Sequence, residues 1–231
     1  MFNFKRTASI IALASVALIA GCSDDDDNNT PEMMDMDYRY QVTVSNLTHA
    51  QPLSPIAAIL HEDGMLWQIG QPASAALEQQ AESGDNSQLL AGYPYSASGS
   101  GVVMPGVDGV VEVSIKNNAN ALLTVSSMLV NTNDAFVGLN AIALADLMVG
   151  ESMTMMGHVY DAGTEANNEL ANSIPGPAAG GAGFDATRDD VNFVAMHPGV
   201  VSQDDGLASS VLTQAHRFDN PSVKFTIVRM Q

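Results

Sequence analysis

The sequence is short of three features, and each shortage excludes a class of protein. One cysteine stands alone, so a thiolate metal site and a disulfide within the chain are both excluded. There are 8 Lys and Arg against 26 Asp and Glu, and the formal net charge of −18 disfavours binding to nucleic acid or anionic lipid headgroups. No apolar run reaches the roughly 20 residues that a membrane-spanning helix needs. Such an acidic chain is compatible with divalent cations as partners.

The familiar catalytic motifs are missing too. The five histidines form no H-E-x-x-H or other recognised zinc spacing. Residues 99–101 (GSG) do not complete the G-x-S-x-G turn of a hydrolase nucleophile, and the glycines of 176–183 do not form a dinucleotide-binding loop. The chain is therefore predicted not to be an enzyme. A Ser-His-Asp site assembled from distant loops is the catalytic alternative that the sequence leaves open.

The lone cysteine lies at the end of a secretory signal. Two basic residues at positions 5–6 precede an apolar run over 10–20. Residues 18–22, LIAGC, resemble the lipobox of bacterial lipoproteins, in which the cysteine is acylated after cleavage. The resemblance implies anchoring in a lipid bilayer of the bacterial cell envelope through Cys22, and Ser23 after it implies the outer membrane. The alternative is an ordinary cleaved signal followed by a stray cysteine.

The chain is predicted to have three segments. Residues 1–21 are the lipoprotein signal peptide, and their removal leaves 6 basic residues against 26 acidic ones. Residues 22–37 are rich in aspartate and lack any basic residue, which predicts a disordered tether that repels itself. Residues 38–231 have the length and hydrophobic content of one domain.

The domain is predicted to be all-β, an antiparallel β-sandwich with one or two short helices. Short runs with the alternation of strands cover residues 38–44, 56–61, 110–115, 122–130 and 223–228. The Asn-rich turn at 116–120 predicts a hairpin between the two strands that flank it. Helix formers over 72–82 predict a helix that ends near Gly84, and 141–147 is predicted to be a second helical turn.

Three acidic residues stand out by their context. Glu112 lies inside an otherwise apolar strand, Asp134 directly follows a long strand, and Asp161 lies in the segment YDAGTE. The loops of a sandwich gather at its two ends, so carboxylates from separate loops can meet and offer oxygen ligands to a cation such as Ca²⁺. The alternative is that each carboxylate only caps a turn.

Several segments resemble the spondin N-terminal domain. Residues 134–138 (DAFVG) are similar to its Asp-Trp-Phe-Val-Gly segment, and residues 160–165 (YDAGTE) to its Asp-Ala-Gly-Thr-Asp segment. Segments at 46–55, 81–84 and 221–229 resemble its beginning and its closing strand. The resemblance runs from about residue 40 to residue 229, in the order of the family.

The resemblance implies a C2-like antiparallel sandwich with a divalent cation, usually taken as calcium, at one end. Carried over by motif, Asp134 and Asp161 match the metal-binding aspartates, Glu112 matches a strand glutamate, and Glu165 could contribute through a water. The chain departs from the family at Ala135, where the family has tryptophan, and it lacks the modules that flank the animal domain. Integrin and matrix binding are therefore not carried over.

Together these inferences predict a membrane-anchored, non-catalytic, metal-binding lipoprotein. It would act as a surface binding or adhesion module with an unidentified extracellular or envelope ligand, and it would not bind nucleic acid. The alternative is a structural or accessory envelope lipoprotein in which the metal only stabilises the fold.

Overall fold

The computed structural model describes residues 36–231. The predicted signal peptide, Cys22 and nearly all of the predicted tether lie outside the described residues. The first strand, β1, begins at Asp37, one residue before the predicted start of the domain. No helix in the described part of the chain has the length and apolar character needed to cross a membrane.

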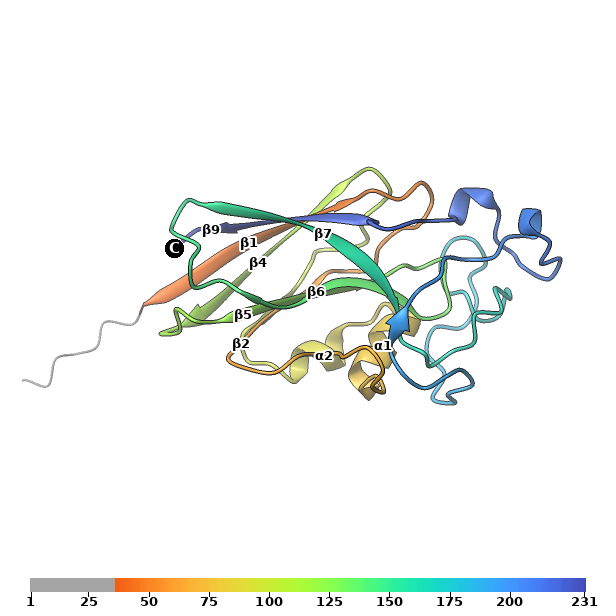
Figure 1. Ribbon diagram of the computed structural model, residues 1–231, viewed down its shortest axis with the longest axis horizontal. Coiled ribbons are helices and arrows are strands. Elements are labelled where there is room, and N and C mark those ends of the chain that lie inside the picture. Colours follow the sequence, from red (N-terminus) through yellow and green to blue (C-terminus); the bar gives the residue numbers. More distant parts are fainter. Residues whose placement is uncertain (1–35) are drawn as a thin grey trace, which may run out of the picture. The chain divides into compact units, whose positions relative to one another are not determined.

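The described residues form an antiparallel all-β domain with two short α-helices, which confirms the predicted fold class (Figure 1). The strands are β1 (Asp37–Asn46), β2 (Ala57–His61), β3 (Ser96–Ser98), β4 (Asp108–Lys116), β5 (Leu122–Met128), β6 (Ala135–Ala143), β7 (Ser152–Asp161), β8 (Ala195–Met196) and β9 (Val223–Arg229). Their hydrogen-bonded order is β3-β2-β5-β6-β7-β9-β1-β4, and β8 pairs with β7.

Strand β7 joins the two layers of the sandwich. Its first half, Ser152–Gly157, pairs with β9 in the layer that also contains β1 and β4. Its second half, from His158 to Asp161, pairs with β6 in the layer that contains β2, β3 and β5. A Cβ at Gly157 would lie 2.4 Å from the ring of Phe225, so only glycine lets β7 pass so close to β9 at the point where it changes layer.

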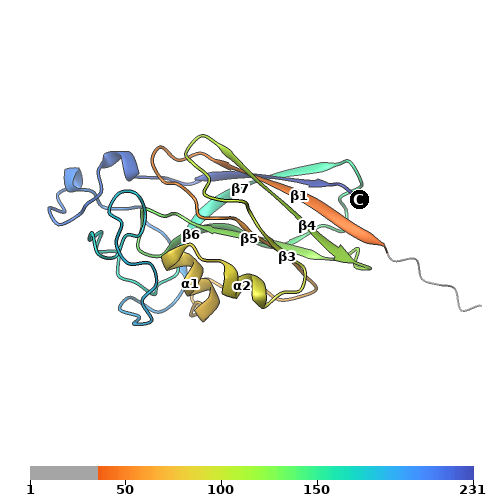
Figure 2. The ribbon, with the colours of Figure 1, turned by 180° about the vertical axis from the view of Figure 1, so that it is seen from behind.

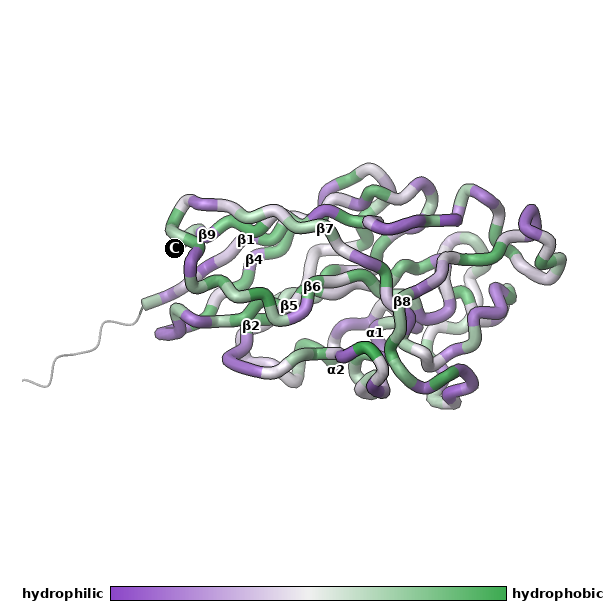
Figure 3. The backbone as a smooth tube through the Cα atoms, in the orientation of Figure 1, coloured by the Kyte–Doolittle hydropathy of each residue, from purple (hydrophilic) through white to green (hydrophobic). Residues whose placement is uncertain are grey.

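Hydrophobic side chains from both layers fill the space between them. In β1 the alternate residues Tyr40, Val42 and Val44 are buried, as the alternation in the sequence predicts. They pack with residues of the other layer, including Leu123 and Val125 of β5. Figure 3 shows the tube hydrophobic along much of β5 and β6, the strands of the second layer.

The two helices cover the outer face of the second layer (Figure 2). Helix α1 (Ala75–Ser83) packs on β5 and β6, and α2 (Ser87–Ala91) follows at once. Ser74 caps α1 by accepting a hydrogen bond from the Leu77 N–H, and the helix ends at Gly84 in a left-handed conformation. The predicted helix over 72–82 is therefore confirmed, with a start that lies slightly later.

Two local predictions were wrong. Residues 116–120 do not close a hairpin, because β4 pairs with β1 while β5 pairs with β2 and β6, so this connection crosses between layers. Residues 141–147 are not helical: the first three complete β6, and turns follow. The second helix is instead at Ser87–Ala91, where the sequence was not predicted to be helical.

The start of β1 and the long connection between β7 and β9 lie at opposite ends of the domain (Figure 1). Pairing sets Tyr40 of β1 opposite Arg229 near the C-terminus, and Asn46 opposite Val223. Val223 is also opposite Gly157, and β7 runs on from there to Asp161. The candidate site described next is therefore at the end remote from Asp37.

Candidate functional site

Strand pairing brings two of the predicted metal ligands together. Strands β6 and β7 are in register with Ala135 opposite Asp161, and the Ala162 N–H donates to the carbonyl oxygen of Asp134 at 3.3 Å. Asp134 ends the turn before β6, and Asp161 ends β7, so both carboxylates lie at the same edge of the sheet. The two segments that carry the family resemblance are thus neighbours in space.

Asp134 is fully buried, and only one of its carboxylate oxygens has partners. Oδ2 accepts hydrogen bonds from the Thr164 N–H at 2.7 Å, the Thr164 hydroxyl at 3.1 Å and the Glu165 N–H at 3.1 Å. Oδ1 is buried with no hydrogen-bond partner. Burial, followed by repulsion from Asp161, raises the pKa of Asp134 to about 7. Such a carboxylate is destabilised when ionised unless a cation joins it.

Asp161 is held by its own turn and by a chain of side chains. Its Oδ1 accepts from the Gly163 N–H at 2.7 Å, and its Oδ2 accepts from the Asn167 amide at 2.6 Å. The Asn167 Oδ1 lies 3.2 Å from Nε2 of His197, whose Nδ1 accepts from the Gly199 N–H at 3.0 Å. These bonds assign the proton of His197 to Nε2. Burial lowers the pKa of His197 to about 4, so the ring is neutral near pH 7.

Glu165 adds a third carboxylate next to Asp134. Its Oε2 is buried without a hydrogen-bond partner. Burial raises the pKa of Glu165 to about 8, with further repulsion from Glu82, Asp134, Asp189 and Asp185 in that order. All the charged groups that act on Glu165 are therefore themselves acidic.

Two further acids of this region were not predicted from the sequence. Glu82, in the last turn of α1, is fully buried; its Oε2 accepts from the Asp185 N–H, and its Oε1 has no partner. Glu169 is also buried, with Oε1 accepting from the Val201 N–H and Oε2 unpartnered. Burial is the main cause that raises the pKa of each. We call these five acids the carboxylate cluster: Glu82, Asp134, Asp161, Glu165 and Glu169.

A backbone turn that only glycine can form sets the spacing of the cluster. Gly163 has a φ of 70°, in the left-handed region. A Cβ built on it would lie 2.2 Å from the carbonyl oxygen of Phe193. The turn allows the Thr164 and Glu165 N–H groups to reach Asp134, so the glycine of the YDAGTE segment has a clear structural reason.

Arg188 holds the neighbouring loop against α1. Its guanidinium pairs with both carboxylate oxygens of Glu78 and donates to the carbonyl oxygen of Ala73. Glu78 is buried, so this pair satisfies a charge that would otherwise be destabilising.

Glu112 lies elsewhere. It projects from the exposed face of β4, between the buried Val111 and Val113, and its Oε1 accepts from the amide of Gln41 at 3.3 Å. The structure thus brings Asp134, Asp161 and Glu165 together and leaves Glu112 apart from them. Cys22, the predicted lipidation site, lies outside the described residues.

The cluster offers oxygen donors, the ligand type that a hard cation prefers. Calcium takes 6–8 oxygen ligands, which include carboxylates, amide and backbone carbonyls, and water. Unpartnered buried oxygens are present on Asp134, Glu165 and also on Asn133, whose Oδ1 is orphaned. Within residues 36–231 no three His, Cys, Asp or Glu side chains are already arranged to hold a metal ion. Side-chain rotation, the Asn133 amide, backbone carbonyls and water would have to complete the coordination.

A scan against protein-family models and a search of curated proteins found no match to this chain.

Proposed function

We propose that this chain is a non-catalytic, cation-dependent binding module of the bacterial cell envelope. In this proposal a divalent cation, most suitably Ca²⁺, binds at the carboxylate cluster through Asp134, Asp161 and Glu165. Acylated Cys22 anchors the chain in the bilayer, and the loops around the cation face an extracellular or envelope ligand. The resemblance to the spondin N-terminal domain supports this proposal through the same two segments that carry Asp134 and Asp161.

The single observation that carries the proposal is the set of buried carboxylate oxygens that have no partner. Buried polar atoms are almost always hydrogen-bonded, and buried charges are paired or bind a metal. Here Oδ1 of Asp134 and Oε2 of Glu165 have no partner, and their acidic neighbours repel one another. A bound cation would satisfy both atoms and cancel the repulsion.

A structural role for the cation is the second candidate, and the burial of the cluster favours it. Asp134 is fully buried and Asp161 nearly so, so an ion there would mainly tie β6 and β7 to the loop that follows. Glu165 is only half-buried, which leaves one side open toward a ligand. The two candidates share the ion and differ in whether a partner binds beside it.

Calorimetric titration with Ca²⁺ after treatment with EDTA tests the ion site. We expect saturable binding to the wild type and its loss in Asp134→Asn and Asp161→Asn. Glu112→Gln is the matched control, since Glu112 is acidic, exposed on β4 and apart from the cluster, and it should bind as the wild type does. Calcium binding that survives both aspartate substitutions would refute the site.

Two further measurements separate the remaining parts of the proposal. Labelling of cells with an alkyne-bearing fatty acid should mark the wild type and not Cys22→Ser, because the thiol is the acylated group. A glycan and protein array probed with and without EDTA should give a cation-dependent ligand. A stabilising ion with no captured ligand would select the structural alternative.

A further inference from the structure

Strands β6 and β7 separate along half of their length and leave two strand edges facing each other. Their pairing runs from Ala135 to Gly138 and ends there. Beyond that point Leu139–Ala143 pairs only with β5, and Ser152–Met156 pairs only with β9. Within the described residues, no backbone pairing joins the facing edges of these two half-strands. Backbone donors and acceptors on such edges are available to another strand.

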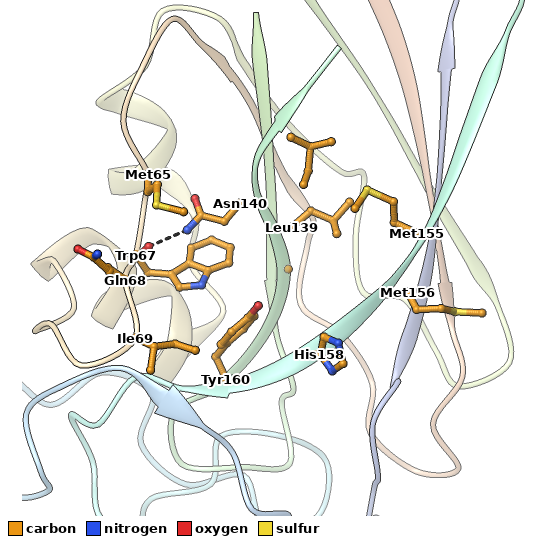
Figure 4. Close-up of a pocket in the computed structure, with 12 residues that line it drawn as sticks. Met65, Trp67, Gln68, Ile69, Leu139, Asn140, Met155, Met156, His158 and Tyr160 are labelled. Atoms are coloured by element: carbon orange, nitrogen blue, oxygen red, sulfur yellow. Dashed lines mark hydrogen bonds between the residues drawn. The ribbon is translucent and has the colours of Figure 1, made fainter. Parts of the chain in front are cut away.

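A cavity of about 540 Å³ lies where the two strands diverge (Figure 4). We call it the β6–β7 cleft. Its lining is mostly apolar and aromatic: Met65, Trp67, Gln68, Ile69, Leu139, Ile142, Met155, Met156, His158 and Tyr160. The volume is within the usual range of about 300–1,000 Å³ for ligand sites.

The floor of the cleft is rigidly built. The Trp67 ring contacts those of Phe136 and Tyr160 edge-on, with centroids 5.1 and 5.4 Å away. Trp67 fits there because residue 138 is glycine: a Cβ at that position would lie 2.8 Å from the indole ring and 2.3 Å from the Val125 carbonyl oxygen. Trp67 and Phe136 are only 5% and 0% exposed, so they form a fixed backing, and the half-buried ring of Tyr160 is the aromatic surface that is open to a ligand.

A bulge in β6 shapes the wall of the cleft. Asn140 and Ala141 together oppose Thr124, and Ala141 has a φ of 55° although it is not glycine. The bulge aims Asn140 at the loop that carries Trp67, where it accepts from the Leu66 N–H at 2.9 Å and donates to the Trp67 carbonyl oxygen at 2.7 Å. A non-glycine residue in this region is strained, and such strain is concentrated at functional sites.

We propose that the β6–β7 cleft binds an extended peptide segment of a partner protein, which adds a strand to the open edge of β6 or β7. The free edges would supply main-chain hydrogen bonds, and the methionines and aromatic rings would receive alternate side chains of the peptide. This inference does not depend on the cation, since none of the cluster acids lines the cleft.

The charge around the cleft limits which peptide segments can bind there. The cleft has no Lys or Arg in its lining, and the loop that leads to Met65 carries the exposed acids Glu62 and Asp63. An acidic peptide would be repelled and would find no counter-charge there. The segment is therefore apolar at alternate positions and neutral or basic at its ends.

Trp67 makes the test direct, because it is the single tryptophan of the chain and lines the cleft. The probe is the synthetic peptide acetyl-KVTVTVK-amide, titrated into the full domain in EDTA and in Ca²⁺. We expect a saturable change in tryptophan emission in both conditions. The same peptide N-methylated at alternate residues, on the edge that would pair, should bind at least about tenfold more weakly, because its backbone donors are blocked. A version with glutamate ends should also bind more weakly.

Variants keep the result tied to the cleft. Ile69→Gln and Met65→Gln change residues that are 57% and 62% exposed, so they should leave folding intact. They remove apolar contact without adding a charge that would attract the lysine ends of the probe, so they should reduce peptide affinity by about tenfold or more. Met104→Gln, at an exposed methionine outside the lining, is the matched control and should bind as the wild type does. Strand addition would be overturned by equal affinity for the N-methylated peptide or by no response at millimolar peptide. It would also be overturned if the cleft binds a fatty acid, palmitate, that the peptide cannot displace.

Discussion

Replacing Asp134 by asparagine removes one negative charge from the carboxylate cluster and keeps the shape of the side chain. The amide oxygen can take the place of Oδ2 and accept from Thr164 and Glu165. The amide nitrogen then occupies the position of Oδ1, which has no partner in the wild type. The substitution therefore removes a buried, repelled charge at the expense of one buried donor.

The pKa of Asp134 sets the size of the effect. It rises from 3.8 to about 7 on folding, a difference of about 3 pKa units, and each unit corresponds to about 1.4 kcal/mol. A carboxyl whose pKa is raised on folding contributes fully below its unfolded pKa, and this contribution is lost as the pH rises through 4 to 7. At pH 8 without metal, ionised Asp134 thus destabilises the fold by about 4 kcal/mol. Since the new donor costs about 1–3 kcal/mol, we expect Asp134→Asn to be more stable than the wild type by about 1–3 kcal/mol.

Calcium should shift that difference toward the wild type. An ion that binds only the folded state stabilises it by about 2.7 kcal/mol at a hundredfold excess over its Kd, and the variant would not gain this. Urea denaturation at pH 8, in EDTA and in excess Ca²⁺, measures both differences, with Glu112→Gln as a control that should behave as the wild type in each. A variant that is less stable than the wild type in EDTA would show that the charge of Asp134 is not destabilising. A calcium-dependent gain equal to that of the wild type would show that the ion does not bind there.

Three other changes test the surroundings of the cluster. Gly163→Ala introduces a Cβ against the Phe193 carbonyl oxygen at a φ of 70°, so it should lower the free energy of unfolding by about 1–3 kcal/mol in urea denaturation, and an unchanged value would contradict the strained turn. Arg188→Met leaves the buried Glu78 without its counter-charge and should lower the free energy of unfolding by about 2–3 kcal/mol in urea denaturation. Adding Glu78→Gln should restore most of this loss. Folding lowers the pKa of His197 from 6.5 to about 4, so the unfolded chain takes up the proton first as the pH falls. The stability that the neutral ring contributes is complete above pH 6.5 and is lost as the pH falls to 4. Denaturation from pH 7 to 4 should therefore show His197→Gln gaining about 3 kcal/mol relative to the wild type, and parallel curves for the two proteins would reject a neutral buried ring.

Alternation that matches a sheet with one buried face accompanies the predicted strands β1, β4 and β9, whereas β2 and β5, also predicted, are buried at nearly every residue. β1 and β4 show it clearly, because their buried residues are Val, Tyr and Ile at every second position. β7 was not predicted, since Gly157 lies in its middle and its pairing is with two different layers. Residues 141–147 are rich in helix formers, but the bulge at Ala141 and pairing with β5 override that preference.

For the candidate site, the sequence predicted the residues that lie in short recognisable segments and did not predict the acids that pack around them. Asp134 and Asp161 were predicted to meet, and the register of β6 and β7 does bring them to one edge. Glu82 was predicted only as the last residue of the helix over 72–82. In the structure Glu78 and Glu82 are four residues apart in α1, and both are buried, as are Leu77 and Ala81. Glu169 and Asn133 could not be assigned, because their burial depends on a long connection that has no periodic pattern.

The placement of β1 has a mechanical consequence. Its N-terminal residue, Asp37, lies at one end of the domain. The ten residues of β1 span roughly 33 Å, and the carboxylate cluster lies past the other end of this strand. If the chain is anchored through Cys22 and holds a ligand at the far loops, as proposed, tension between the two would run along β1. Its backbone hydrogen bonds to β4 and β9 are perpendicular to the strand, so they would be loaded in shear and all together. Such an arrangement resists pulling far better than one in which strand pairs open one bond at a time.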